Sequence, residues 1–234
     1  MSITPLLKRE LKEFYIREPF STIVSFGILS FVFTLFIPQI AAIQIPFVRI
    51  LLIFITPIAI MMLFSSPLLY REFYRDIIEK KIEVLLGIGL TNIQIWLAKV
   101  TAICMVLYAL FITGFICANI ISIFTDNGAL WSAGLSGLEW VIFLFLSPLT
   151  GLCIVAFIGF LFLVIKKVVV VTYIPMILFF VVAFIIKRLK LVANEPKFWI
   201  DLKVGVIFFL IVSIISIIVP IIFLKLWKNE RIIG

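Results

Sequence analysis

The chain has 234 residues, of which 65% are hydrophobic and 14% charged. A soluble domain has roughly half its residues apolar and about a quarter charged, so this composition excludes an ordinary soluble fold and indicates an integral membrane protein. The formal net charge of +8 is typical of cytoplasmic loops that face anionic lipid, and we do not expect a nucleic-acid partner.

The N-terminal segment, residues 4–18, has the pattern of an amphipathic helix. Its apolar side chains fall on one face at helical spacing: Leu7, Leu11, Phe14 and Tyr15. Such a helix lies in the plane of the membrane interface, where its basic side chains are expected to face lipid phosphates: Lys8, Arg9, Lys12 and Arg17. Pro19 is expected to end the helix and to turn the chain into the membrane.

Six apolar segments are long enough to cross the hydrocarbon core, which takes about 20 residues. They are residues 20–39, 47–70, 98–124, 139–165, 168–186 and 204–224. The predicted fold class is therefore an all-α integral membrane protein, and residues 1–234 form a single transmembrane domain. Proline predicts kinks at Pro57, Pro67, Pro148 and Pro175. Small residues in the fourth span favour close helix contact: Gly151, Cys153, Ala156 and Gly159.

The distribution of basic residues predicts the orientation. With six spans and both termini in the cytoplasm of a multi-pass cell-membrane protein, the inner segments hold fourteen Lys and Arg residues and the outer side six. The loop 187–203 departs from this bias, because it carries five basic residues on the outer side. Its Phe198 and Trp199 suggest that it dips into the outer interface, where aromatic rings are favoured.

The expected spans contain no ionisable side chain at mid-membrane, and the whole chain contains no histidine. Ion-coupled pumps usually need an intramembrane carboxylate, and intramembrane proteases need Ser–His, zinc or paired-aspartate sites. No phosphate-binding GxxxxGK[ST] loop occurs either. No metal site or catalytic residue is therefore predicted, and such a protein is passive, structural, or driven by a partner.

Residues 71–97 form the one long polar segment, which is expected in the cytoplasm between the second and third spans. On a helix, its apolar side chains are predicted to form a continuous stripe: Phe73, Tyr74, Ile77, Ile78, Ile82, Leu85 and Leu86. Asp76 and Lys80 have the spacing of an i,i+4 ion pair.

A tight turn is predicted after this helix. Gly87 and Gly89 can adopt the left-handed backbone that ends a helix, and Thr91 or Asn92 can cap the next one, which begins near Ile93. By pattern alone, the segment is either a helix–turn–helix that touches a partner or an ordinary solvated loop.

Residues 81–99, KIEVLLGIGLTNIQIWLAK, resemble the motif of ABC-2 type permeases, the membrane subunits of ATP-binding cassette exporters. That family commonly reads T-L-E-x-L-L-x-x-P-L-S-x-x-x-I-x-x-[GA]-K. The matching residues are Glu83, Leu85, Leu86, Leu90, Ile95, Ala98 and Lys99. The chain departs from the motif where Lys80 and Lys81 replace Gly-Thr and where Gly89 replaces proline. The six spans and the interfacial helix are similar to the family over the whole length.

The resemblance implies a cytoplasmic coupling helix that seats in a separate ATPase subunit. The residues it assigns to that contact are Arg75, Glu79, Ile82, Glu83, Leu86, Gly87, Gly89, Leu90, Thr91 and Lys99, with Glu83 and Lys99 bracing the helix pair. It further implies that ATP and magnesium bind to the partner and not to this chain, and that two permease copies, identical or related, enclose the path.

The function predicted from these observations is the permease subunit of an ABC exporter for an amphipathic or hydrophobic substrate such as a peptide, drug or lipid-like molecule. The chain itself is then not an enzyme. The alternative is a membrane scaffold or assembly protein, which spans free of charge would suit equally. An intramembrane lipid-modifying enzyme is disfavoured by the lack of catalytic side chains.

Overall fold

The computed structural model describes residues 4–17, 19–43, 46–125, 129–130, 134–165 and 202–226, and all regular elements among them are helical. Within these described residues, three helices are long and apolar enough to cross a membrane: Arg49–Ile78, Asn92–Phe124 and Gly137–Val164. Two shorter apolar stretches are Gly27–Ala41 and Leu210–Leu226. The all-α class is thus confirmed, in a form compatible with a transmembrane protein. The predicted span 168–186 lies outside the described residues, and so does the predicted loop 187–203 except for residues 202 and 203, which are helical.

The helices follow the order expected from the apolar pattern. They are α1 (Thr4–Arg17), α2 (Pro19–Ala41), α3 (Pro46–Leu69), η1 (Tyr70–Tyr74, a π-helix), α4 (Arg75–Ile78), α5 (Lys81–Gly87), α6 (Asn92–Phe124), α7 (Gly137–Val141), η3 (Ile142–Leu146, a π-helix), α8 (Ser147–Val164) and α10 (Leu202–Leu226). We call residues 70–91, from η1 to the start of α6, the elbow.

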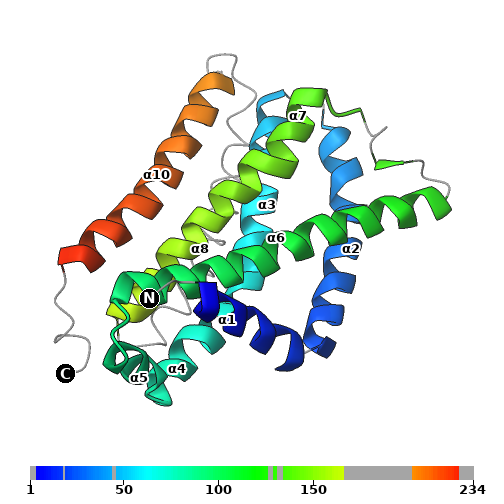
Figure 1. The fold of residues 1–234 in the computed structure, drawn as a ribbon. Helices are drawn as coiled ribbons and strands as arrows, with labels where there is room; N and C mark the ends of the chain where they lie inside the picture. Colours follow the sequence, from blue (N-terminus) through cyan, green and yellow to red (C-terminus); the bar gives the residue numbers. More distant parts are fainter. Residues whose placement is uncertain are drawn as a thin grey trace.

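The long helices pack around α8, which contacts α3, α6 and α10. Helix α2 packs on α6, and the short α1 also lies against α6. Figure 1 shows α4 and α5 projecting together at one end of the molecule, close to α1. The elbow and the N-terminal helix therefore share the end of the bundle at which α6 begins.

Small residues permit the closest helix contacts, as the sequence predicted for the fourth span. A Cβ built on Gly151 would lie 3.0 Å from Cβ of Met61, and one built on Gly159 would lie 3.1 Å from Cγ2 of Val100. Buried Ala156 presents its carbonyl oxygen to Nε1 of Trp96, which donates a hydrogen bond of 3.2 Å. These contacts fix α8 against α3 and α6.

One π-helix has a clear cause in the sequence. Pro148 stands at the start of α8, directly after η3. The backbone nitrogen of proline has no hydrogen to donate. Its ring also clashes with the carbonyl of the residue four positions earlier, here Leu144 of η3. A local π turn accommodates such a ring. A π-helix thus precedes the proline at which the sequence predicts a kink.

The elbow differs from the single helix predicted for residues 71–86. Helix α4 ends at Ile78, Lys80 adopts a left-handed backbone with φ 54°, and α5 begins at Lys81. Phe73 and Ile82 are nine residues apart, so on one straight α-helix they would point about 180° away from each other. Both are buried in the same core, 0% and 4% exposed. The break lets both side chains reach it, and the predicted continuous stripe is wrong.

Candidate functional site

The turn after α5 has the geometry that its glycine predicted. Gly89 has φ +87°, its N–H donates to the carbonyl of Leu86 at 3.0 Å, and the N–H of Leu90 donates to the carbonyl of Leu85 at 3.2 Å. This pair of bonds is a Schellman motif, which is usually accompanied by a hydrophobic contact between the residues at its two ends. Leu85 and Leu90 are both buried in the core cluster. The turn is therefore closed and anchored.

Helix α6 begins with a complete capping box. The hydroxyl of Thr91 accepts from the N–H of Gln94 at 3.3 Å, and the side chain of Gln94 accepts from the N–H of Thr91 at 2.9 Å. Such reciprocal bonds satisfy two of the free donors at a helix start. The predicted cap at Thr91 or Asn92 is thus Thr91, and it fixes where the elbow joins α6.

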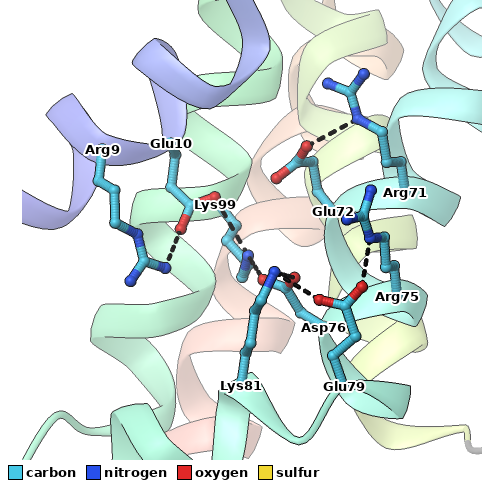
Figure 2. A network of polar contacts seen from close by, with 9 residues as sticks. All are labelled: Arg9, Glu10, Arg71, Glu72, Arg75, Asp76, Glu79, Lys81 and Lys99. Carbon is cyan, nitrogen blue, oxygen red and sulfur yellow. Dashed lines mark hydrogen bonds and ion pairs between the residues drawn. The ribbon is translucent and has the colours of Figure 1, made fainter. Parts of the chain in front are cut away.

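A buried ionic cluster joins α1, α6 and the elbow (Figure 2). At its centre is Lys99 of α6, which is 0% exposed. Its Nζ donates to Oδ2 of Asp76 in α4 at 2.5 Å and to Oε2 of Glu10 in α1 at 3.3 Å. Asp76 and Glu10 are themselves 7% and 1% exposed. Removing a buried ammonium from such a pair would leave two buried carboxylates without their cation, which is strongly destabilising.

Further ion pairs surround this centre on the elbow. Arg71 contacts Glu72 at 3.0 Å, and Lys81 lies 3.6 Å from Asp76 and 2.6 Å from Glu79. Arg75 and Glu79 form an exposed i,i+4 pair at 2.6 Å. The predicted pair between Asp76 and Lys80 is wrong, because the break of the helix at Lys80 leaves Asp76 facing α6.

Two carboxyl groups of this cluster have lowered pKa values. Burial by itself raises the pKa of Glu10, but the charge of Lys99, a hydrogen bond with Glu72 and the contact with Arg9 outweigh it, so the net pKa lies below the ordinary 4.5. Hydrogen bonds from Lys81 and Arg75 lower the pKa of Glu79 to about 2. Both groups are therefore ionised at neutral pH.

The elbow exposes three aliphatic side chains. Ile78, Val84 and Ile88 are 61%, 65% and 55% exposed. Val84 lies in α5 and Ile88 directly follows this helix, where its N–H donates to the carbonyl of Val84 at 3.1 Å, so the two residues lie one turn apart on the same side. They are flanked by exposed charged residues: Arg75, Glu79, Lys80 and Glu83. An apolar face with a charged border is the kind of surface that seats in a groove of a partner.

The residues assigned to the partner contact divide into two groups. Those exposed on the elbow are Arg75, Glu79, Glu83, Gly87, Gly89 and Thr91, with Leu86 half-buried. Ile82, Leu90 and Lys99 are buried within the chain. Lys99 contacts Asp76 and Glu10, whereas Glu83 points outward, so the bracing contact in this structure is with Asp76. The second group holds the elbow in place, and the first group is available at its surface.

The N-terminal helix keeps its basic residues at the surface. Lys8, Arg9 and Lys12 are exposed, and Arg9 contacts Glu10 at 3.0 Å. Leu6 and Glu10 are buried, while Leu7 and Leu11 are half-buried. The side chain of Arg17 lies outside the described residues. The buried face of α1 thus carries a carboxylate that the apolar pattern did not predict.

Sequence reasoning missed four members of this site: Glu10, Glu72, Val84 and Ile88. Asp76 was predicted with a different partner, Lys80, and Ile78 was predicted only as part of the apolar stripe. One sequence signal was available for Glu10, which lies four residues after the apolar Leu6 and therefore on the same helical face.

In comparisons with known proteins, no family model, no curated sequence and no solved structure matches this chain.

Proposed function

We propose that this chain is the permease subunit of an ABC exporter, and that its elbow docks on a separate cytoplasmic ATPase. The observation that carries the proposal is the exposed apolar face of the elbow, Ile78, Val84 and Ile88, on a turn that is itself firmly anchored. A surface that only met water would gain nothing from side chains of this kind, whereas a partner groove would cover them.

The anchoring supports a role in force transfer. The elbow is held by the Schellman turn at Gly89, by the capping box at Thr91 and by the ion pair of Lys99 with Asp76. A push on its outer face therefore reaches α3 and α6, the two long helices that it joins. The resemblance of residues 81–99 to ABC-2 type permeases supports the same proposal.

In the proposed architecture the chain has six membrane spans and both termini lie in the cytoplasm. The substrate path lies between two copies of the chain. The substrate is amphipathic or hydrophobic, since the spans offer aliphatic and phenylalanine side chains. ATP and magnesium bind to the partner. The basic face of α1, formed by Lys8, Arg9 and Lys12, lies against lipid phosphates.

Purification of the tagged chain from native membranes tests the proposal. We expect a cassette ATPase, identified by its own phosphate-binding loop, to co-purify, and we expect its hydrolysis rate to change when the two proteins are reconstituted together in liposomes. Val84→Asp and Ile88→Asp should abolish the association, whereas the matched control Val84→Ile should keep it.

Two results would overturn the proposal. One is the absence of any cassette ATPase from a complex that contains the intact chain, which would favour a scaffold. The other is movement of cargo across vesicles by the purified chain without nucleotide hydrolysis.

A further inference from the structure

We propose that Lys99 is a positioning residue that makes α1 and the elbow move as one body. The transfer of force to α1 rests on the proposed function, but the mechanical link does not. Lys99 touches both segments at once, at 3.3 Å to Glu10 of α1 and at 2.5 Å to Asp76 of the elbow (Figure 2).

The ionic part of the link runs through one side chain from a third helix. Helix α1 packs on α6, and the elbow joins α6 through the turn at Gly89. The ion pairs of Lys99 join α1 to the elbow through α6. A side-chain hydrogen bond between Glu10 of α1 and Glu72 of η1 lies beside them.

Burial makes this link strong. Lys99 is 0% exposed, so neither water nor salt can replace its carboxylate partners without opening the contact between α1 and α6. Separating the elbow from α1 would leave an ammonium or a carboxylate buried without its partner. A displacement of α4 by a partner must therefore carry Glu10, and with it the interfacial helix, in the same direction.

The consequence concerns the membrane surface. The exposed side of α1 carries Lys8, Arg9 and Lys12, which are suited to lipid phosphates. A body made of α1 and the elbow connects this surface with the docking face of Val84 and Ile88. The motion of a partner would then reach the inner membrane interface as well as the spans.

A distance measurement on the chain alone tests the link. Cys104, Cys117 and Cys153 are replaced by alanine, and spin labels are attached to Lys12→Cys on α1 and Glu83→Cys on α5, both exposed positions. In nanodiscs, pulsed electron resonance should give one narrow distance distribution. Lys99→Met should broaden it and remove its main peak.

A second variant covers the case in which Lys99→Met does not fold. Glu10→Gln keeps the size of the side chain and removes the charge that holds α1, so it should broaden the distribution as well. The matched control is Lys81→Met, since Lys81 also contacts Asp76, at 3.6 Å, but belongs to the elbow itself. This control should leave the distribution narrow.

The proposal is overturned if Lys99→Met and Glu10→Gln both leave the distribution unchanged, or if Lys81→Met broadens it equally. Neither result depends on an ATPase. With the partner ATPase bound, ATP should change the mobility of a label at Lys12→Cys in the parent chain and not in the Glu10→Gln variant. If no such ATPase exists, the proposed function fails while the link between α1 and the elbow can still stand.

Discussion

Gly159 of α8 lies directly against the ring of Phe73 in η1, since a Cβ built on Gly159 would come within 3.2 Å of Cε2 of that ring. The same Cβ would lie 3.1 Å from Val100 and 3.3 Å from Leu69. Phe73 also stacks on Phe162 one turn further along α8, with ring centroids 6.5 Å apart. The base of the elbow is thus packed against α8 with no room for a larger residue.

Gly159→Val should therefore destabilise the fold. Added methyl groups must displace Phe73 or Val100, and overpacking of this kind typically costs about 1–3 kcal/mol in the free energy of unfolding. Thermal unfolding in detergent would measure the change. Gly27→Val is the matched control, because no atom lies within 4 Å of its added Cβ. Equal melting temperatures for the two variants would contradict the close contact.

Gly89→Ala should destabilise the turn of the elbow. At φ +87° a Cβ is strained, and the left-handed region costs an L-residue about 1–2 kcal/mol. Gly87→Ala is the control, since Gly87 is the last residue of α5 and has open space around it. Limited proteolysis of the elbow and thermal unfolding would both report the difference. A Gly89→Ala variant as resistant as Gly87→Ala would argue against the turn.

Asp76→Asn should cost far more stability than removal of an exposed charge. It leaves Lys99 buried with a weakened partner set, and breaking a buried pair typically costs about 3–5 kcal/mol. Glu79→Gln is the control, because its pairs with Arg75 and Lys81 are exposed and contribute little. Chemical unfolding of the two variants at neutral pH provides the comparison, and similar midpoints would show that the contact of Asp76 with Lys99 is weak.

Acid should loosen α1 from α6 through Glu10. Because the pKa of Glu10 is lowered in the folded chain, its contribution to stability is present above its ordinary value of 4.5 and is lost as the pH falls below that value towards the folded pKa. The mobility of a spin label at Lys12→Cys, followed from pH 7 downward, should rise in that acid range.

The Glu10→Gln variant is the control for the acid experiment. It should show a mobile α1 already at neutral pH, and its mobility should change less on acidification, because the titrating group is absent. A label that responds to acid equally in both proteins would assign the effect to another carboxyl, such as Glu79, whose pKa is about 2.

Local chemistry explains why much of the fold was predictable. The left-handed turn at Gly89, the cap at Thr91 and the close helix contact at Gly159 each follow from one residue type and its immediate neighbours. Apolar length alone indicated the helices now seen as α3, α6 and α8.

The ionic cluster could not be predicted in this way. Glu10 and Lys99 are 89 positions apart, and only the packing of α1 on α6 brings them together. Asp76 had a suitable partner in Lys80 on a continuous helix. The helix instead breaks at Lys80, which the burial of both Phe73 and Ile82 requires, and Asp76 pairs with Lys99. Ile78 was predicted on one apolar stripe with Phe73 and Ile82, but it is exposed whereas they are buried, and the exposed Val84 was assigned to no face.

The π-helix η1 sets the direction in which the rest of the elbow, from α4 onward, faces. A π turn holds one more residue than an α turn, and one residue on an α-helix corresponds to a rotation of about 100°. If residues 70–74 had continued α3 as an ordinary helix, Asp76 would have been turned away from Lys99 by about that angle. The single additional residue in this turn thus rotates α4 relative to α3 about the helix axis. Deleting one residue from the turn would rotate α4 so that its side chains face another direction.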